Sequence, residues 1–328
     1  TDNHFHYGYF TKATGLLGLY DPAFLKDFGE IARLVAKQYA NWDRQDLDFP
    51  FLRTFDVWEG HSNAGGSSSP GGNNQESSSE AMQSWGGLFL LGQAMGDEKM
   101  TAVGAMGHAM EAEATMEYWF DRNRENFSSN YQHEVTGILF GGGRAYATYF
   151  SGDPAWIYGI QWLPESPILE YLAEDPAFAR RKFEDMMKAR KVKEGKTDIH
   201  GMGTGLGNVI LAYVALFDPG WVAGQMDQLW TMNSPVAHDN DTPGLTYYFT
   251  HARRMLGARQ WDFHMSLPMS AVYYNSNTKK FSFVACNPAS EPRTARVFRQ
   301  GREIGSIVVP ARSMASVHEL KAVVTGGK

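Results

Sequence analysis

The chain has 328 residues and a mass of 36.6 kDa, enough to bury a large core as one large domain or two smaller ones. Its net charge of −6 and isoelectric point near 5.9 argue against nucleic acid as the partner. No run of about 18 apolar residues occurs, so no membrane-spanning helix is expected. The single cysteine, Cys286, excludes an intrachain disulfide.

Up to about residue 260, the sequence predicts helices joined by short turns rich in Gly, Pro and Asp. The stretch Pro22–Ala40 carries apolar residues at helical spacing, with Asp21 as cap and Pro22 at the first helical position. Further helical segments are predicted at Glu76–Ala94, Lys99–Phe120, Ala177–Lys191, Leu206–Phe217, Trp221–Trp230 and Leu245–Leu256. Helices paired in this way favour an (α/α) toroid, a mainly α fold with catalytic residues on the loops and helix ends of one rim.

The long segment 41–74 interrupts this series of helices. Loops beyond about 15 residues in compact domains are usually functional or disordered, and the small residues of Gly65–Gly72 predict a flexible tip. After residue 264 the apolar period changes to two, which predicts short strands at Ser270–Asn275, Lys280–Asn287, Thr294–Arg299, Glu303–Val309 and Met314–Leu320. We therefore expect a helical domain over residues 1–263 and a small antiparallel β region over residues 264–328, with Thr325–Lys328 as a frayed end.

Two carboxylates four residues apart, Glu76 and Glu80, stand at the predicted start of a helix. Side chains at this spacing share one helix face, about 6 Å apart, where like charges are mildly destabilising. One interpretation is functional, namely a carboxylate pair kept together for its chemistry. The other is structural, because Ser77 and Glu80 fit the capping box, in which each side chain satisfies a backbone N–H of the other residue.

Four segments of the chain resemble one known family. They read Asp-Asn-His-Phe-His-Tyr-Gly-Tyr-Phe at residues 2–10, Asp-Val-Trp-Glu-Gly-His-Ser at residues 56–62, Asn-Gln-Glu-Ser-Ser-Ser-Glu-Ala at residues 74–81 and Gly-Ile-Gln-Trp-Leu-Pro-Glu-Ser-Pro at residues 159–167. In this order they resemble the motifs of glycoside hydrolase family 81, the endo-β-1,3-glucanases or laminarinases. Aromatic residues make up 13% of the chain, which suits a glycan cleft because aromatic planes stack on sugar C–H faces.

This resemblance implies a fold, a reaction and a location. The fold is an (α/α)6-type toroid, here with a small C-terminal antiparallel β appendage. The reaction is endo-acting hydrolysis of β-1,3-glucans such as laminarin and curdlan by an inverting mechanism, which uses one carboxylic acid and one carboxylate. Asp2 matches the general acid and Glu76 the general base, while Glu80 is the neighbour that shifts the proton affinity of its partner or orients the water. The expected partner is the polysaccharide, the expected state is a monomer, and secretion is implied although this chain shows no signal peptide.

Family members also carry a large N-terminal β-sandwich and at least one barrel helix before the first of these motifs, which here begins at residue 2. The resemblance therefore implies a catalytic C-terminal portion that lacks upstream helices. We expect such a portion to be less active and less stable than a longer chain. The alternative function is that of a truncated, non-catalytic β-glucan-binding fragment.

The same motifs supply candidates for substrate binding. They are His6, Tyr7, Tyr9, Asp56, Trp58, His61, Gln161 and Trp162. The aromatic members could stack on glucose rings, with core packing as the alternative. His6 matches an active-site histidine of the family and could tune the proton on Asp2 or bind a sugar hydroxyl. Asp56 and His61 could line subsites or could hydrogen-bond to the backbone of their own loop, and Gln161 could donate to a sugar hydroxyl.

Other patterns are weaker, and we expect no metal and no cofactor. The pair His4-x-His6 has no obvious cluster to supply a third metal ligand. Asp239-x-Asp241 resembles the start of a calcium loop, but Pro243 and Thr250 stand where an EF-hand needs ligands. The glycine-rich stretch Gly201–Gly207 follows no strand, so a nucleotide site is not indicated. A polysaccharide lyase on the same toroid is a further alternative, although an acidic chain is a poor host for acidic sugars.

Overall fold

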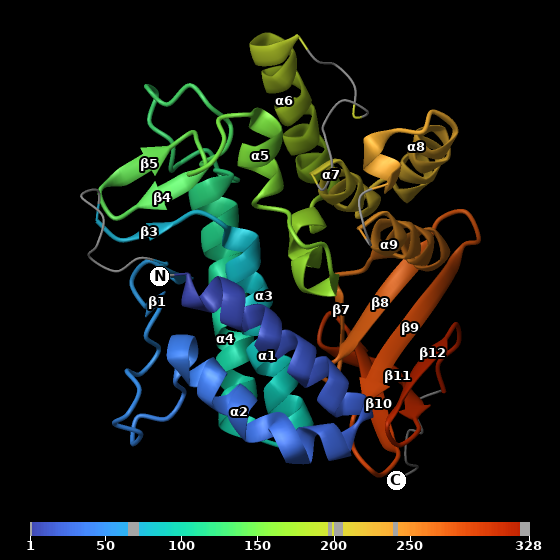
Figure 1. Cartoon of the computed structure of the whole chain (residues 1–328). Coiled ribbons are helices and arrows are strands. Elements are labelled where there is room, and N and C mark those ends of the chain that lie inside the picture. The colour runs from blue at the N-terminus through green and yellow to red at the C-terminus, as the bar shows by residue number, and fades with distance from the viewer. Residues whose placement is uncertain (1, 65–71, 196–198, 200–205, 239–241, 322–328) are drawn as a thin grey trace.

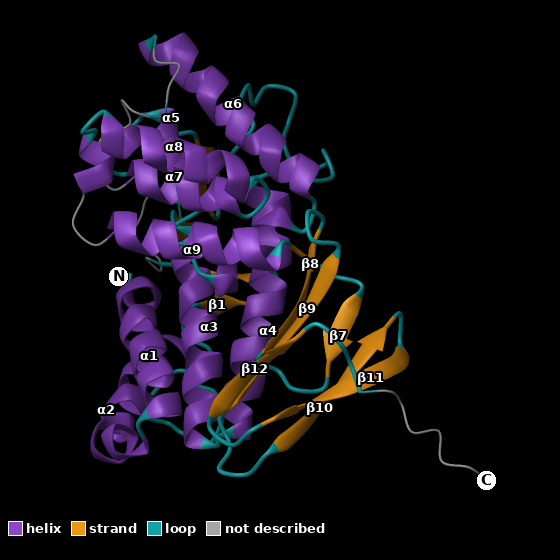
Figure 2. Ribbon diagram, turned by 90° about the vertical axis from the view of Figure 1, so that its right-hand side faces the viewer, coloured by secondary structure: helices purple, strands orange, loops and turns teal. Residues whose placement is uncertain are grey.

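The computed structural model describes residues 2–64, 72–195, 199, 206–238 and 242–321, which form a predominantly helical body with antiparallel sheets (Figure 1). A view turned by 90° shows the long strands gathered on one side of the helices (Figure 2). Four predicted features lie wholly or largely outside the described residues. They are the loop tip Gly65–Gly72, the glycine-rich stretch Gly201–Gly207, the pair Asp239 and Asp241, and the end Thr325–Lys328.

The predicted helical segments are confirmed with small shifts of their ends. The α-helices of the described part are α1 (Asn3–Tyr20), α2 (Pro22–Ala40), α3 (Ser78–Met95), α4 (Glu98–Ala114), α5 (Pro154–Gly159), α6 (Pro176–Glu194), α7 (Leu206–Ala215), α8 (Pro219–Thr231) and α9 (Thr242–Leu256). Helix α4 continues as a π-helical turn at Thr115–Trp119, and 3₁₀ turns occur at Pro167–Ala173 and Pro235–His238. Helices α1 and α5 are absent from the sequence prediction.

Asp-Pro pairs explain where several helices begin. At Asp21, Asp175 and Asp218 the aspartate side chain accepts hydrogen bonds from backbone N–H groups of the first turn of α2, α6 and α8. The proline that follows has a fixed backbone angle suited to the first turn and lacks an N–H that would have no partner there. Cap and proline together make these boundaries readable from the sequence.

Helices α1 and α3 run parallel and in close contact. Three side-chain pairs join α1 to α3 and the strand before it, at a constant offset of 71 residues, which requires both segments to run in the same direction. The pairs are His4 with Gln75, Tyr9 with Glu80, and Lys12 with Gln83. Glycines allow the close approach: a Cβ at Gly8 would lie 2.6 Å from the Cβ of Ser84, and one at Gly15 would lie 2.6 Å from the backbone nitrogen of Leu91. The N-terminal ends of α1 and α3 therefore lie together.

The strands within the described residues form four small antiparallel sheets. Their bounds are β1 (Phe55–Asp56), β2 (His61–Ser62), β3 (Asn74–Gln75), β4 (Ile138–Phe140), β5 (Gly143–Ala145), β6 (Ala258–Arg259), β7 (Phe263–Met265), β8 (Ser270–Asn275), β9 (Lys280–Asn287), β10 (Arg293–Arg299), β11 (Arg302–Val309) and β12 (Ser313–Val317). The orders are β1-β2, β3-β4-β5, β12-β9-β8-β6 and β11-β10-β7. The strands predicted after residue 264 are confirmed as β8 to β12. Strand β6 pairs with β8, so the four-stranded sheet also includes residues before position 264.

Three apolar cores stabilise these layers. The largest surrounds Trp119 and Trp162 in the helical body, a second surrounds Trp85 between α2, α3 and α4, and a third lies between the two C-terminal sheets around Phe283 and Val297. Burial of side chains this large is the main favourable term in folding. No helix among the described residues is long and apolar enough to cross a membrane.

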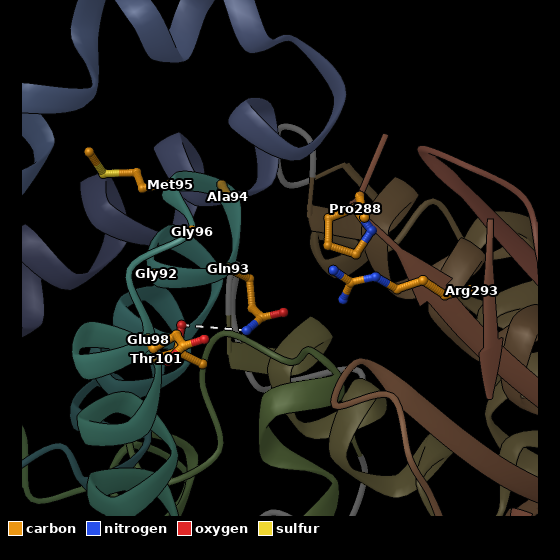
Figure 3. A pocket seen from close by; sticks show the side chains of 10 residues that line it. Gly92, Gln93, Ala94, Met95, Gly96, Glu98, Thr101, Pro288 and Arg293 are labelled. Carbon is orange, nitrogen blue, oxygen red and sulfur yellow. Dashed lines mark hydrogen bonds between the residues drawn. The ribbon is translucent and has the colours of Figure 1, made fainter. Parts of the chain in front are cut away.

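A cavity of about 450 Å³ lies between the C-terminal end of α3 and the connection from β9 to β10 (Figure 3). Gln93 and Thr101 line its helical side, where the Gln93 amide donates to the Thr101 hydroxyl over 3.4 Å. Pro288 and Arg293 line its other side. The cavity lies at the opposite end of α3 from Glu80, and it is therefore separate from the predicted carboxylates.

Candidate active site

The three predicted catalytic carboxylates lie at the shared end of α1 and α3. Asp2 directly precedes α1, and Glu76 and Glu80 flank the start of α3, so the parallel packing of the two helices brings together residues more than 70 positions apart. The backbone holds this arrangement, because the Asp2 N–H donates to the Ala64 carbonyl over 3.1 Å and the Ala64 N–H donates to the Asn74 carbonyl over 2.7 Å. The segment of Asp2 is thereby tied to the strand that precedes Glu76.

Glu76 is partly buried and sits among like charges. Its Oε1 accepts a hydrogen bond of 2.7 Å from the backbone N–H of Tyr149. Burial raises the pKa of Glu76, the Tyr149 hydrogen bond acts against this, and the charges of Glu80 and Asp2 raise the pKa further. Glu76 is thus the carboxylate that the charges of both Glu80 and Asp2 affect. A carboxylate that holds its proton more firmly than usual suits a base that must take a proton from water.

The backbone of Glu80 takes part in a helix cap, while its carboxylate is free for another role. The Ser77 hydroxyl accepts from the Glu80 backbone N–H over 3.3 Å, so the cap predicted from Ser77 is present. The Glu80 carboxylate instead accepts from the Tyr9 hydroxyl of α1 over 2.9 Å. Burial and the charge of Glu80 raise the pKa of Tyr9 far above its usual range, so Tyr9 stays a neutral donor. Only half of a capping box is therefore formed, and the Glu80 side chain faces α1.

Two aromatic side chains of this part of the chain, Trp58 and Tyr149, are largely exposed to solvent. Trp58 is 93% exposed on the turn that joins β1 to β2, and its stacking on a glucose ring stays a prediction. Tyr149, which the sequence analysis did not single out, is 62% exposed. Partial burial raises the pKa of its hydroxyl, and the charges of Glu76 and Asp2 raise it further. Tyr149 follows β5 by four residues, and only the pairing of β3 with β4 and β5 brings it to Glu76. His6 is exposed on α1, whereas Tyr7 is partly buried against the core around Trp85.

The structure corrects the predicted roles of Gln161 and Trp162. Gln161 is fully buried: its Oε1 accepts from the backbone and hydroxyl of Ser78, and its Nε2 donates to the carbonyls of Glu76 and Gly137. Trp162 is fully buried and stacks on Tyr213 at 3.8 Å between ring centroids. Neither side chain is accessible to a sugar. Gln161 instead holds the backbone of Glu76 and the first turn of α3 in place.

His61 follows the structural alternative stated for it, whereas Asp56 makes the backbone hydrogen bonds of that alternative and stays partly exposed. His61 is 2% exposed, its Nδ1 donates to the Ser62 carbonyl over 2.8 Å, and its ring meets Trp119 edge to face. A direct contact between His61 and a sugar is therefore excluded. Asp56 accepts from the backbone N–H groups of Trp58 and Glu59 in a local turn, and this turn presents Trp58 to solvent.

A buried polar network that the sequence did not predict lies behind the carboxylates. Its members are fully or almost fully buried and come from α1, β2, β3, α3 and α4: His4, Ser62, Gln75, Trp85 and Glu111. The Glu111 carboxylate accepts from the Gln75 amide over 3.0 Å, the Trp85 indole over 2.7 Å, and the backbone and hydroxyl of Ser62 over 3.0 and 2.8 Å. Burial raises the pKa of Glu111, and the charge of His61 and the hydrogen bonds from Trp85 and Ser62 oppose that rise.

Comparisons with known proteins show the family to which the chain belongs. The model of the glycosyl hydrolase family 81 C-terminal domain matches residues 1–232. The chain belongs to glycoside hydrolase family 81. It is 32% identical over 297 residues to a glucan endo-1,3-beta-D-glucosidase of Acetivibrio thermocellus, which covers 89% of this chain and 36% of the relative. It is 29% identical over 319 residues to a glucan endo-1,3-beta-D-glucosidase of Thermobifida fusca, with 96% and 40% covered.

A solved structure supports the same assignment. A mutant of a family 81 glycoside hydrolase from Clostridium thermocellum matches with a TM-score of 0.84 and 30% sequence identity, over 97% of this chain and 42% of that one. The chain thus spans less than half the length of these relatives.

The four family 81 segments meet at one end of α1 and α3. The segments at 2–10 and 74–81 carry the carboxylates, the segment at 56–62 supplies Ser62 to the buried network, and the segment at 159–167 supplies Gln161 as a support. Within the described residues, no group of three or more His, Cys, Asp or Glu side chains could hold a metal ion.

Proposed function

We propose that this family 81 chain catalyses endo-acting hydrolysis of β-1,3-glucan, with laminarin and curdlan as substrates. The supporting observation is the gathering of Asp2, Glu76 and Glu80 where α1 and α3 begin, with Glu76 under the charge of the other two. The named relatives from Acetivibrio thermocellus and Thermobifida fusca, both glucan endo-1,3-beta-D-glucosidases, point to the substrate class.

In the proposed inverting mechanism, Asp2 protonates the leaving glycosidic oxygen while Glu76 takes a proton from the attacking water on the opposite face of the sugar. This reaction needs a separation of about 6.5–9.5 Å between the two carboxyl groups, which leaves room for that water. Glu80, held by Tyr9, keeps a second negative charge near Glu76 and so strengthens it as a base. His6, Tyr7, Tyr9, Asp56 and Trp58 remain proposals for sugar contacts, and Tyr149 joins them because its backbone N–H donates to Glu76.

The helical part is proposed to belong to an (α/α)6-type toroid. Paired helices with functional residues at their ends support this architecture. We keep the division into a catalytic region at residues 1–263 and a β region at residues 264–328, the second of which has its own apolar core. The protein is proposed to act outside the cell, where such polysaccharides occur, and as a monomer.

Replacement of the proposed base tests this function. Glu76→Gln keeps the shape of the side chain and an oxygen that can accept from Tyr149, but the amide cannot take a proton from water. Turnover of laminarin, measured as reducing sugar released, should fall about 10²- to 10⁴-fold. In the same experiment, early proton NMR of a wild-type digest should show the α-anomer first.

Glu98→Gln is the matched control, because Glu98 is an exposed glutamate in the first turn of α4 beside the distant cavity. Its activity should equal that of the wild type. Near wild-type activity in Glu76→Gln contradicts the assignment of the base, and a β-anomer first contradicts inversion. A wild-type chain that binds laminarin without releasing sugar supports the alternative of a non-catalytic glucan-binding fragment.

A further inference from the structure

Hydrogen bonds link Glu111 to Gln75 and Gln75 to His4, and the chemistry of these groups decides which atom donates in each bond. A carboxylate only accepts, and four donor groups converge on Glu111. The Gln75 amide must therefore turn its N–H₂ toward Glu111 and its oxygen toward His4, whose Nε2 lies 3.0 Å away. An amide oxygen also only accepts, so His4 must carry its proton on Nε2.

The imidazole of His4 is neutral and has one remaining nitrogen. Burial lowers the pKa of His4 to about 3, so the ring holds a single proton. Its Nδ1 is buried without a hydrogen-bond partner among the described residues. Nothing at Nδ1 therefore selects the tautomer, and the choice rests on Gln75 and, through it, on Glu111.

The contact of His4 with Gln75 also joins the two catalytic segments. His4 is two residues from Asp2, and Gln75 is the neighbour of Glu76. The hydrogen bond between His4 and Gln75 is thus a direct side-chain contact between the segment of the proposed acid and the segment of the proposed base. Ser62, which donates to the same carboxylate, is two residues from Ala64, whose carbonyl accepts from the Asp2 N–H.

Resting on the function proposed above, we propose that Glu111 is a positioning residue: its carboxylate orients the Gln75 amide, holds His4 in the Nε2–H tautomer and so fixes Asp2 against Glu76. The residue contacts no substrate and acts only through Gln75 and His4. A group displaced by about 1 Å in such a site can cost about 100-fold in rate, so a distant carboxylate can control turnover.

Glu111→Gln tests the direction of these bonds. The new amide can accept from Ser62 and Trp85 with its oxygen, but its N–H₂ then faces the N–H₂ of Gln75. Gln75 must turn over, and His4 must either move its proton to Nδ1 or lose the contact. In ¹⁵N-histidine-labelled protein, the Nε2–H signal of His4, assigned by its absence in His4→Gln, should disappear. The kcat on laminarin should fall about 10- to 100-fold, with KM changed less than about twofold because substrate contacts remain.

Exchanging the side chains of positions 111 and 75 should restore both the His4 tautomer and the rate. In the double variant Glu111→Gln and Gln75→Glu, the carboxylate at position 75 accepts from His4 and from the new amide at position 111, and every donor again has an acceptor. The Nε2–H signal should return, and kcat at the pH optimum should recover at least tenfold over the single variant. Glu170→Gln, a buried glutamate outside the network, is the control for general loss of stability and should leave both readouts unchanged in folded protein.

Several outcomes overturn the proposal. They are an Nδ1–H tautomer in the wild type, an unchanged kcat in Glu111→Gln despite a changed tautomer, and a double variant that regains the tautomer but not the rate. The wild-type tautomer can be measured even if a variant fails to fold. A wild-type chain that shows the Nε2–H tautomer but releases no sugar contradicts the proposed function separately, because the NMR readout does not depend on turnover.

Discussion

A general base works only while it is ionised, and the surroundings of Glu76, the proposed base, oppose ionisation. Because burial and the charges of Glu80 and Asp2 raise its pKa, Glu76 stays protonated to a higher pH than an ordinary glutamate. Activity should therefore fall, as the pH is lowered, at a higher pH than that of a free carboxylate. The acidic side of the pH profile of kcat/KM reports this ionisation.

Glu80→Gln should move that acidic side to lower pH. The substitution removes one negative charge beside Glu76 and keeps an oxygen for the Tyr9 hydroxyl, so the pKa of Glu76 falls and the base stays ionised in more acidic solution. The plateau rate should also fall, because a weaker base takes a proton less readily. The measurement is kcat/KM on laminarin across the acidic range, with Glu98→Gln as the charge-matched control. If the acidic side of the pH profile stays in place or moves to higher pH, Glu80 does not act on Glu76 through its charge.

The close packing of α1 on α3 is the element-scale feature that creates the site. Two parallel helices place their N-terminal ends side by side, and the positive ends of their dipoles partly offset the repulsion among the carboxylates. The glycines of α1 set the distance between the helices, since backbone of α3 occupies the space where a side chain at Gly8 would lie.

Gly8→Ala should therefore damage both stability and activity. A Cβ at position 8 would lie 2.6 Å from the Cβ and 2.7 Å from the Cα of Ser84, so α1 must move away from α3. We expect a loss of about 1–3 kcal/mol in the free energy of unfolding and a lower kcat in the folded protein, as Asp2 moves with its helix. Gly224→Ala on the exposed face of α8 meets nothing within 4 Å and should instead stabilise the chain by about 0.5–1 kcal/mol. Equal behaviour of the two variants would contradict this account.

The same helices show why some elements are readable from the sequence and others are not. Helix α2 can be predicted from Asp21, Pro22 and a regular apolar stripe. Helix α1 lacks a side-chain cap bond from Asp2, and it contains three buried glycines, which have low helix propensity. Those glycines are favourable only because α3, and at Gly18 also Leu25 of α2, lies against them. The two-residue strand β3 likewise has no pattern of its own and depends on β4.

The residues of the candidate site also differ in whether the sequence alone could predict them. The family segments point to the carboxylates proposed as catalytic, but they could not separate accessible residues from the buried residues that support them. Gln161 and Trp162 stand in a motif beside the site and are buried, because hydrogen bonds to Ser78 and Glu76 and stacking on Tyr213 draw them inward. Tyr149 and Glu111 belong to none of the four segments, and only the tertiary fold brings them to the site.

At the scale of the whole molecule, one buried glutamate joins the helical body to the C-terminal strands. Glu170, on the 3₁₀ turn Pro167–Ala173, accepts from Arg253 of α9 over 2.5 Å, from Arg259 of β6 over 2.6 Å and from the Tyr273 hydroxyl of β8 over 2.8 Å. Glu170 and Arg253 are at most 5% exposed. Three segments from different layers thus depend on a single carboxylate.

Glu170→Ala should destabilise the chain strongly while sparing the chemistry. The substitution leaves the buried guanidinium of Arg253 without its carboxylate, and removal of one partner of such a pair costs about 3–5 kcal/mol. Asp262→Ala is the matched control, because it breaks the exposed pair of Asp262 with Arg299 (2.7 Å), which is worth at most about 1 kcal/mol. Urea unfolding measures both free energies, and laminarin turnover per folded molecule should match the wild type in each variant. Losses of similar size in the two variants would show that the strands do not depend on Glu170, and that the helical body and the β region are held together by their apolar contacts alone.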